Sequence, residues 1–193
     1  MVSNRIRNVA FLSTYPPREC GLATFTQDLA RELDKVGLLG RPKVIAVSDD
    51  RYAYSDRVIM ELRQHDRRSY AETAAAINNS DIELLVIEHE YGIFGGKAGE
   101  YILDLVDRLQ IPFVTTLHTV LPRPDSKQKE ILRRLGEKSA RIVTMANNTA
   151  PILERVYGID PAKVEVIHHG VPYRIVPSRE KLKERHGLSG EAS

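Results

Sequence analysis

Leu84-Leu85-Val86-Ile87-Glu88-His89-Glu90-Tyr91-Gly92-Ile93-Phe94-Gly95-Gly96 begins as an apolar run and then turns polar and rich in glycine. The first four residues do not alternate with polar ones, which predicts a strand buried on both faces of a parallel sheet. The glycine-rich segment is what we expect where the carboxyl end of such a strand opens into a loop. Ligands bind at that edge of open α/β sheets, so the segment 89–96 is the first candidate for a binding site.

Apolar strands and amphipathic helices alternate from this stretch toward both ends of the chain. We predict strands at 9–13, 43–47, 58–62, 83–87, 112–117, 141–145 and 164–167, and helices at 21–36, 70–78, 97–109, 126–138, 148–157 and 178–186. The first helix should bury Leu22, Phe25, Leu29, Leu33 and Val36, and Asn148 should cap the fifth helix. This alternation predicts a Rossmann-like α/β fold, a parallel sheet of about seven strands with helices on both faces.

The composition of the 193 residues limits the classes of function. A net charge of +2 is too small to indicate nucleic-acid binding. The single cysteine, Cys20, excludes an internal disulfide and fits a reducing compartment. No apolar run approaches the roughly 18 residues that a membrane span requires, so we expect a cytoplasmic protein. The spacing of His89, His118, His168 and His169 matches no common zinc pattern, and we predict neither a metal nor a cofactor.

Three loops that follow strands carry the unusual residues, at 14–24, 89–96 and 118–123. They should line one crevice if the sheet order reverses between the first and fourth strands. Gly21 opens a helix there, and either the free amides bind an anion or the glycine only permits a tight turn. His118 can either bind substrate or serve a structural role.

Two glutamates flank His89, and because they alternate along the chain only one should face the crevice. Glu90 is closer to the glycine-rich turn than Glu88, so we select Glu90. Its carboxylate can hold a sugar hydroxyl or act as a base, or it can merely cap the loop.

Two other patterns have simpler explanations. Gly95-Gly96-Lys97 imitates part of a P-loop, but Ala98 stands where that motif has serine or threonine. The predicted helix 126–138 is basic over an apolar face, which suits either peripheral contact with an anionic membrane or a solvated surface. Its basic residues are Lys127, Lys129, Arg133, Arg134 and Lys138.

The order and spacing of five segments resemble the N-terminal half of the GT-B glycosyltransferases, specifically the retaining family 4. These segments are Phe11–Pro17, Cys20–Phe25, His89–Gly96, Thr116–Thr119 and Val166–Pro172. Two positions depart from the family pattern. Cys20 stands where a glycine often precedes Gly21, and His169 stands where an asparagine often precedes Gly170.

The resemblance implies that residues 1–172 form the Rossmann-like N-terminal domain and that 173–193 link it to a C-terminal donor domain absent from this chain. It implies transfer of a hexose, with retention, from a nucleoside-diphosphate sugar bound through that domain to a sugar or lipid-linked acceptor. This chain by itself should then be inactive. By resemblance, His118 is catalytic and Gly21 approaches the donor diphosphate. The acceptor would be bound by Thr24, Glu90, Tyr91, Gly92 and Thr119.

The composition predicts a cytoplasmic protein, and the basic helix at 126–138 allows peripheral contact with the inner face of the membrane. Two alternatives remain open at this stage. A sugar-nucleotide epimerase shares the GT-B architecture, and a non-catalytic Rossmann-like binding domain would need no reactive group in the crevice.

Overall fold

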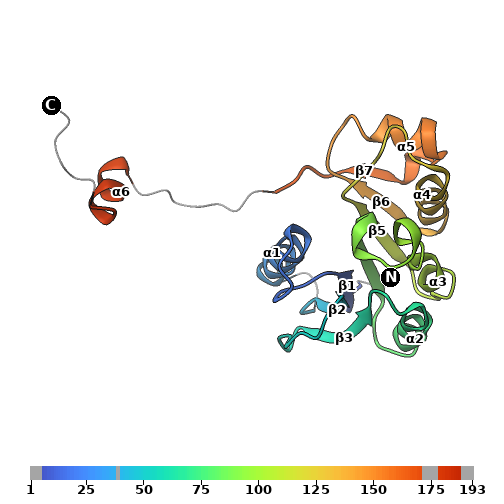
Figure 1. Ribbon diagram of the computed structural model, residues 1–193, viewed down its shortest axis with the longest axis horizontal. Helices are drawn as coiled ribbons and strands as arrows, with labels where there is room; N and C mark the ends of the chain where they lie inside the picture. Colours follow the sequence, from blue (N-terminus) through green and yellow to red (C-terminus); the bar gives the residue numbers. More distant parts are fainter. Residues whose placement is uncertain (1–5, 38–39, 171–177, 188–193) are drawn as a thin grey trace, which may run out of the picture.

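The computed structural model describes residues 6–37, 40–170 and 178–187. They form a seven-stranded sheet in the order β3-β2-β1-β4-β5-β6-β7, with every neighbouring pair parallel (Figure 1). The strands are β1 (Val9–Ser13), β2 (Lys43–Ser48), β3 (Val58–Arg63), β4 (Leu84–His89), β5 (Phe113–Leu117), β6 (Arg141–Thr144) and β7 (Val164–Val166). The predicted parallel α/β sheet is confirmed.

The strand order reverses next to β1, which lies between β2 and β4. From β1 the chain first builds outward to β3, and then crosses back to β4 and builds in the other direction to β7. Because the loops after β1 and β4 leave the sheet in opposite directions, they open a crevice at the carboxyl edge. The predicted reversal between the first and fourth strands is therefore confirmed.

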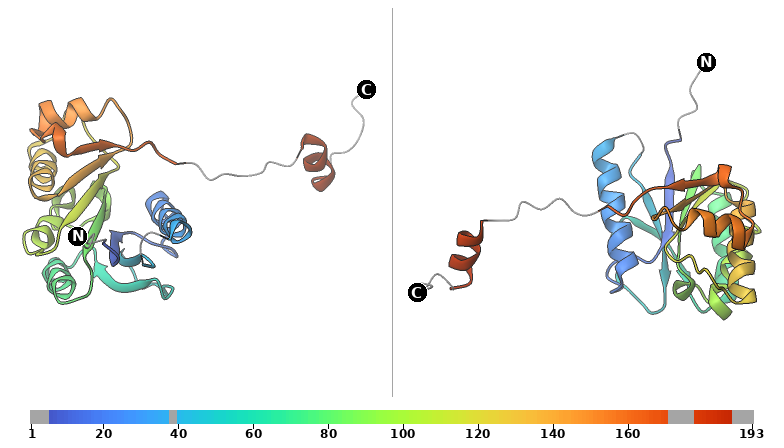
Figure 2. Two further views of the ribbon diagram at one scale, coloured as in Figure 1. Left: turned by 180° about the vertical axis from the view of Figure 1, so that it is seen from behind. Right: turned by 90° about the horizontal axis from the view of Figure 1, so that it is seen from above.

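Helices cover both faces of the sheet, but unequally. The helix α1 lies on one face, and α2, α3, α4 and α5 lie on the other (Figure 2). The helices are α1 (Gly21–Val36), α2 (Arg67–Asn78), α3 (Ile102–Val106), α4 (Ser126–Lys138), α5 (Ala150–Tyr157) and α6 (Arg179–Arg185). Single turns of 3₁₀ helix occur at η1 (Tyr91–Ile93), η2 (Lys97–Gly99) and η3 (Pro161–Lys163).

The core follows this asymmetry. The larger cluster joins one face of every central strand, including Leu12, Ile45 and Ile87, to α2, α3, α4 and α5. The smaller cluster lies under α1 and contains Phe11, Tyr15, Ala30, Val44 and Ala46. The strands therefore place alternate side chains in two separate cores, as expected for a sheet covered on both faces.

The buried face of α1 differs from the predicted one. The helix buries the small residues Ala23, Thr26 and Ala30, whereas Val36 is 56% exposed. Leu22, Phe25, Leu29 and Leu33 are only partly buried. Small side chains let the helix backbone approach the sheet, so the large apolar residues lie along its flanks.

The predicted helix over 97–109 is also wrong in its bounds. Ala98 has φ +54°, and the glycines at 96 and 99 both have φ +80°, so a regular helix begins only at Ile102. A Cβ on Gly95 would lie 2.0 Å from the carbonyl oxygen of Gln64, which leaves no room for a side chain. These glycines therefore serve tight packing of the loop. In the fifth helix, Thr149 rather than Asn148 is the N-cap residue.

The predicted link at 173–193 falls partly outside the described residues. Within the described part of that segment, α6 corresponds to the predicted last helix at 178–186.

Candidate functional site

The loop after β1 is fixed by its own polar groups at the start of α1. The Sγ atom of Cys20 accepts a hydrogen bond from the backbone N–H of Ala23 at 3.3 Å and lies 3.0 Å from the hydroxyl of Thr14. A thiol thus takes the place of the hydroxyl or carboxylate that usually caps a helix. The cap holds the first turn of α1 at the edge of the crevice.

Gly21, the first residue of α1, does not have the positive φ that would require a glycine. It is exposed, and a Cβ added there would meet nothing within 4 Å. The alternative that this glycine merely permits a tight turn therefore finds no basis in its backbone. Open space lies beside the free amides of the helix N-terminus.

His118 contacts Glu88, whereas Glu90 was predicted to be the glutamate that faces the crevice. The Nε2 atom of His118 lies 2.8 Å from Oε2 of Glu88, whose side chain has no exposed surface. The His118 side chain is 13% exposed, and its backbone N–H donates to the carbonyl of His89 at 3.0 Å. The pair thus joins the ends of β4 and β5.

The aromatic ring of Phe25 contacts two histidines from different parts of the chain. Its centroid is 4.9 Å from that of His118, with the rings nearly perpendicular, and 5.1 Å from that of His169. His169 is exposed and follows β7, whereas Nδ1 of the preceding His168 lies 3.3 Å from the carbonyl of Met145. The first helix and the segments after β5 and β7 therefore meet at this ring.

Both carboxylate oxygens of Glu90 accept hydrogen bonds from neighbouring residues of the chain. Its Oε1 accepts a hydrogen bond from the backbone N–H of Tyr91 at 3.0 Å, which caps η1, and its Oε2 accepts one from the hydroxyl of Thr119. Two residues predicted to bind the acceptor are thus brought together. The contacts match the loop-capping alternative for Glu90, while a role in binding stays a prediction.

The other predicted acceptor residues lie in different surroundings. Tyr91 is buried, its hydroxyl lies 3.3 Å from the carbonyl of Gln128, and burial raises the pKa of that hydroxyl above its usual range. Gly92 and Thr24 are exposed. The structure therefore places Thr24 beside the crevice on α1, and Gly92 on the loop after β4.

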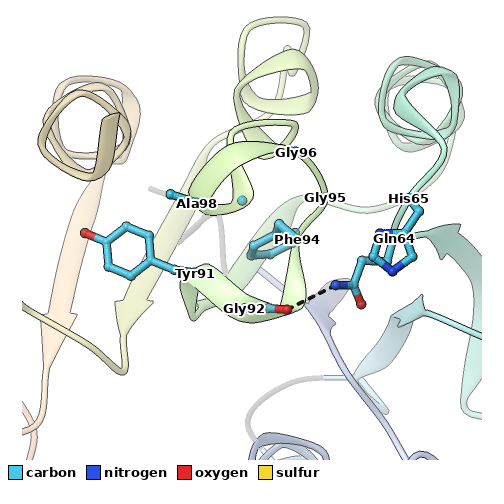
Figure 3. Close-up of a pocket in the computed structure, with 9 residues that line it drawn as sticks. Gln64, His65, Tyr91, Gly92, Phe94, Gly95, Gly96 and Ala98 are labelled. Carbon is cyan, nitrogen blue, oxygen red and sulfur yellow. Dashed lines mark hydrogen bonds between the residues drawn. The ribbon is translucent and has the colours of Figure 1, made fainter. Parts of the chain in front are cut away.

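Beside this loop is a hollow of about 350 Å³ (Figure 3). It is lined by Gln64, His65, Tyr91, Gly92, Phe94, Gly95, Gly96, Ala98 and Gly99. The side-chain amide of Gln64 donates to the carbonyl of Gly92 at 3.0 Å, as Figure 3 shows. The guanidinium of Arg18 donates to Oε1 of the same Gln64 at 3.0 Å and pairs with Asp49. The loop after β1 is therefore tied to the hollow through Gln64.

His89 faces the opposite side of the sheet from Glu88. It is fully buried between Phe94, which stacks on it, and Tyr91, which meets it edge-on. Neither ring nitrogen has a hydrogen-bond partner among the described residues. Burial, together with the charge of nearby His118, lowers the pKa of His89 to about 3, so the ring is neutral at physiological pH. His89 is thus a core residue.

The basic face of α4 is largely paired with acidic side chains. Lys127 contacts Glu100, Arg133 contacts Glu137, and Arg134 and Lys138 both contact Asp107. Within the ranges 6–37, 40–170 and 178–187, no three histidine, cysteine or acidic residues form a group that could hold a metal. No helix in the described part of the chain is long and apolar enough to cross a bilayer.

The crevice can be predicted from the sequence, whereas the contact of Glu88 with His118 was not predicted. The available signal was the alternation of side chains along each strand. Glu88 on β4 and His118 just after β5 both lie on the side of the sheet that faces α1. That signal becomes usable only once β4 and β5 are known to pair with Glu88 opposite Thr116, two residues before His118.

Comparison with known proteins gives a consistent result. The family model described as Glycosyltransferase Family 4 matches residues 20–174, more than half of the chain. No curated protein matches this chain. A glycosyltransferase from Rickettsia africae ESF-5 has a similar fold at 19% identity and a TM-score of 0.61, over 95% of this chain and 50% of that one. The lipopolysaccharide outer core galactosyltransferase WaaB is similar at 9% identity and a TM-score of 0.62, over 90% and 50%. This chain spans about half the length of both.

Proposed function

Since the chain belongs to Glycosyltransferase Family 4, we propose that it is the acceptor-binding part of a GT-B enzyme that transfers a hexose from a nucleoside-diphosphate sugar with retention. Residues 1–172 form this part, and 173–193 lead to a donor-binding domain. The chain by itself is then inactive, because the groups that neutralise the leaving diphosphate belong largely to the other domain. The protein acts in the cytoplasm.

The start of α1 supports an approach of the donor diphosphate. The N-terminus of a helix presents free N–H groups and a favourable dipole to an anion. Gly21 is exposed with open space beside it, so backbone amides can come close to a phosphate without an intervening side chain. Amides already in place stabilise the charge that develops on a leaving phosphate.

One contact carries the proposal. Phe25, in the second turn of the helix that Gly21 begins, touches the ring of His118 at a centroid distance of 4.9 Å. The amides proposed for the diphosphate and the histidine proposed for the transferred sugar are therefore linked through one turn of α1 and the ring of Phe25. A sugar attached to a diphosphate needs that arrangement, since its phosphate and its ring must be bound at the same time.

The acceptor is a sugar or a lipid-linked sugar, and we assign it to the loops beside this pair. Thr24 on α1, the bonded pair Glu90 and Thr119, and the loop at Tyr91 and Gly92 offer hydroxyl, carboxylate and backbone groups that suit sugar hydroxyls. For a lipid-linked acceptor, the basic helix α4 provides peripheral contact with an anionic membrane. Acidic partners on four of its basic residues make this attraction weak.

Acceptor-dependent release of nucleoside diphosphate tests the proposal. The native protein that contains these residues is incubated with UDP-, GDP- and ADP-hexoses, with and without a panel of sugar and lipid-linked acceptors. Release only with acceptor, and a product with retained anomeric configuration, is expected. Release or epimerisation without acceptor would indicate a sugar-nucleotide epimerase. Binding without turnover of any donor would indicate a non-catalytic domain.

A further inference from the structure

Among the described residues, the buried carboxylate of Glu88 has a single side-chain partner. Its exposed surface is zero, and Oε2 lies 2.8 Å from Nε2 of His118. Its other oxygen, Oε1, is buried and has no partner within the described residues. Burial of a carboxylate is costly because the group loses its hydration, so buried carboxylates are rare. A buried carboxylate with one side-chain contact therefore requires an explanation, and a function of that contact provides one.

The sheet itself brings the two residues together. On β1, Ser13 bonds to Thr26 of α1, so the residues in phase with it face α1. Phe11 is two residues before Ser13 and pairs with Val86 of β4, so Val86 faces α1. Glu88 is two residues after Val86 and therefore faces α1 as well, where it pairs with Thr116 of β5. His118 is two residues beyond Thr116 and emerges on that face as well. The contact is thus fixed by strand register rather than by a mobile loop.

We propose that Glu88 is a positioning residue that keeps the proton of the His118 ring on Nε2, so that Nδ1 faces the substrate as a hydrogen-bond acceptor. An ionised carboxylate only accepts hydrogen bonds, and a neutral imidazole has one N–H to donate. The partner of one ring nitrogen therefore sets which nitrogen stays free. Among the described residues, Nδ1 of His118 has no hydrogen-bond partner.

The inference rests on the proposed function and names the chemistry that His118 recognises. An acceptor nitrogen binds the hydroxyl group of a sugar, not an anionic oxygen of the phosphate. The edge contact with Phe25 restrains the plane of the same ring, so Glu88 and Phe25 together fix its orientation.

The protonation of the ring can be measured without any substrate. The chain is labelled with ¹⁵N at its six histidines, and long-range ¹H–¹⁵N spectra are recorded at about pH 8, well above the ordinary histidine pKa of about 6.5. The spectrum of a His118→Gln variant identifies the His118 signals. We expect one tautomer with the proton on Nε2, and a proton on Nδ1, alone or together with Nε2, would overturn the inference.

Variants at Glu88 test whether it is the cause. Glu88→Leu and Glu88→Met both remove the acceptor at similar volume, so one can replace the other if a variant does not fold. Either should convert the single tautomer into a mixture, whereas Glu154→Gln, an exposed change on α5, should leave it unaltered. A single Nε2 tautomer that persists in the folded Glu88 variants would overturn the inference.

The tautomer spectra and the transfer assay test separate claims, so a negative result in one does not decide the other. A proton on Nδ1 in an enzyme that transfers sugar would remove only the role of Glu88. The expected tautomer in a protein that uses no sugar nucleotide would remove only the transferase proposal.

Discussion

Glu88 and His118 come from adjacent strands, and their side chains meet at 2.8 Å with the carboxylate completely buried. His118 is therefore not a freely rotating residue at the end of a strand. Its position is coupled to a buried carboxylate that tolerates poorly the loss of this partner. Changes at His118 should consequently affect stability as well as chemistry, and the two effects have to be measured separately.

The first prediction concerns the stability of this pair. His118→Ala should destabilise the chain by about 1–3 kcal/mol, because it leaves a buried carboxylate without a partner. In a double-mutant cycle with Glu88→Met, the coupling energy from urea unfolding should lie at about 0.5–3 kcal/mol. The same Glu88 variant combined with Thr24→Ala, an exposed change, should be additive within about 0.5 kcal/mol. Additive effects for Glu88 and His118 would show that the contact is not energetically important.

The second prediction concerns turnover. In the native transferase, His118→Ala should lower kcat by about 10²–10³, the usual effect of removing one positioned polar group from a reaction site. Rates are to be compared per folded molecule, because the variant is also less stable. Glu154→Gln serves as the matched control and should keep the full rate. Near-normal turnover by folded His118→Ala protein would exclude His118 from the site.

The third prediction concerns the pH dependence of stability through His89. Its pKa is lowered by burial to about 3 when folded, against about 6.5 when unfolded. The unfolded state alone takes up a proton between these values, so the stability contribution is full above about pH 6.5 and is lost toward pH 3. The slope is about 1.4 kcal/mol per pH unit.

The measurement compares wild type with His89→Leu by denaturant unfolding. On going from pH 7 to about pH 5, wild type should lose about 2 kcal/mol more than the variant. Parallel stability curves for the two proteins would mean that the folded protein accepts a proton on this ring.

The sequence was sufficient for the strands and less so for the helices, for physical reasons. The central strands of the parallel sheet appear as apolar runs, and the sequence predicts all seven strands of the sheet, including the partly exposed edge strands β3 and β7. The buried face of α1 was misassigned because a periodic pattern gives weight to large residues, while contact with the sheet is made by Ala23, Thr26 and Ala30. The start of α3 was misplaced because Ala98 adopts a left-handed conformation that its identity does not suggest.

The site shows the same limit more sharply. The loops of the crevice could be identified from single strands, since each follows an apolar run. The choice between Glu88 and Glu90 depended on how β4 pairs with β5, and register is a property of two strands at once. The link between Glu90 and Thr119 is likewise formed only across those strand ends.

The last prediction separates phosphate binding from turn formation at Gly21. This residue has no positive φ, and a Cβ there meets nothing within 4 Å, so Gly21→Val should change the free energy of unfolding by about 1 kcal/mol at most. In the native transferase the same side chain should obstruct the approach of the diphosphate and raise the KM for the sugar nucleotide.

Gly99→Ala is the contrasting variant, because Gly99 has φ +80° and its Cβ would lie 2.6 Å from the carbonyl oxygen of Tyr91. It should lower the melting temperature clearly, by the strain of its backbone and the clash together. The drop in melting temperature of Gly99→Ala thus gives the effect expected in this chain for a glycine that the backbone conformation requires. If Gly21→Val melts as early as Gly99→Ala and the folded enzyme keeps its KM for the sugar nucleotide, the helix N-terminus does not approach the donor.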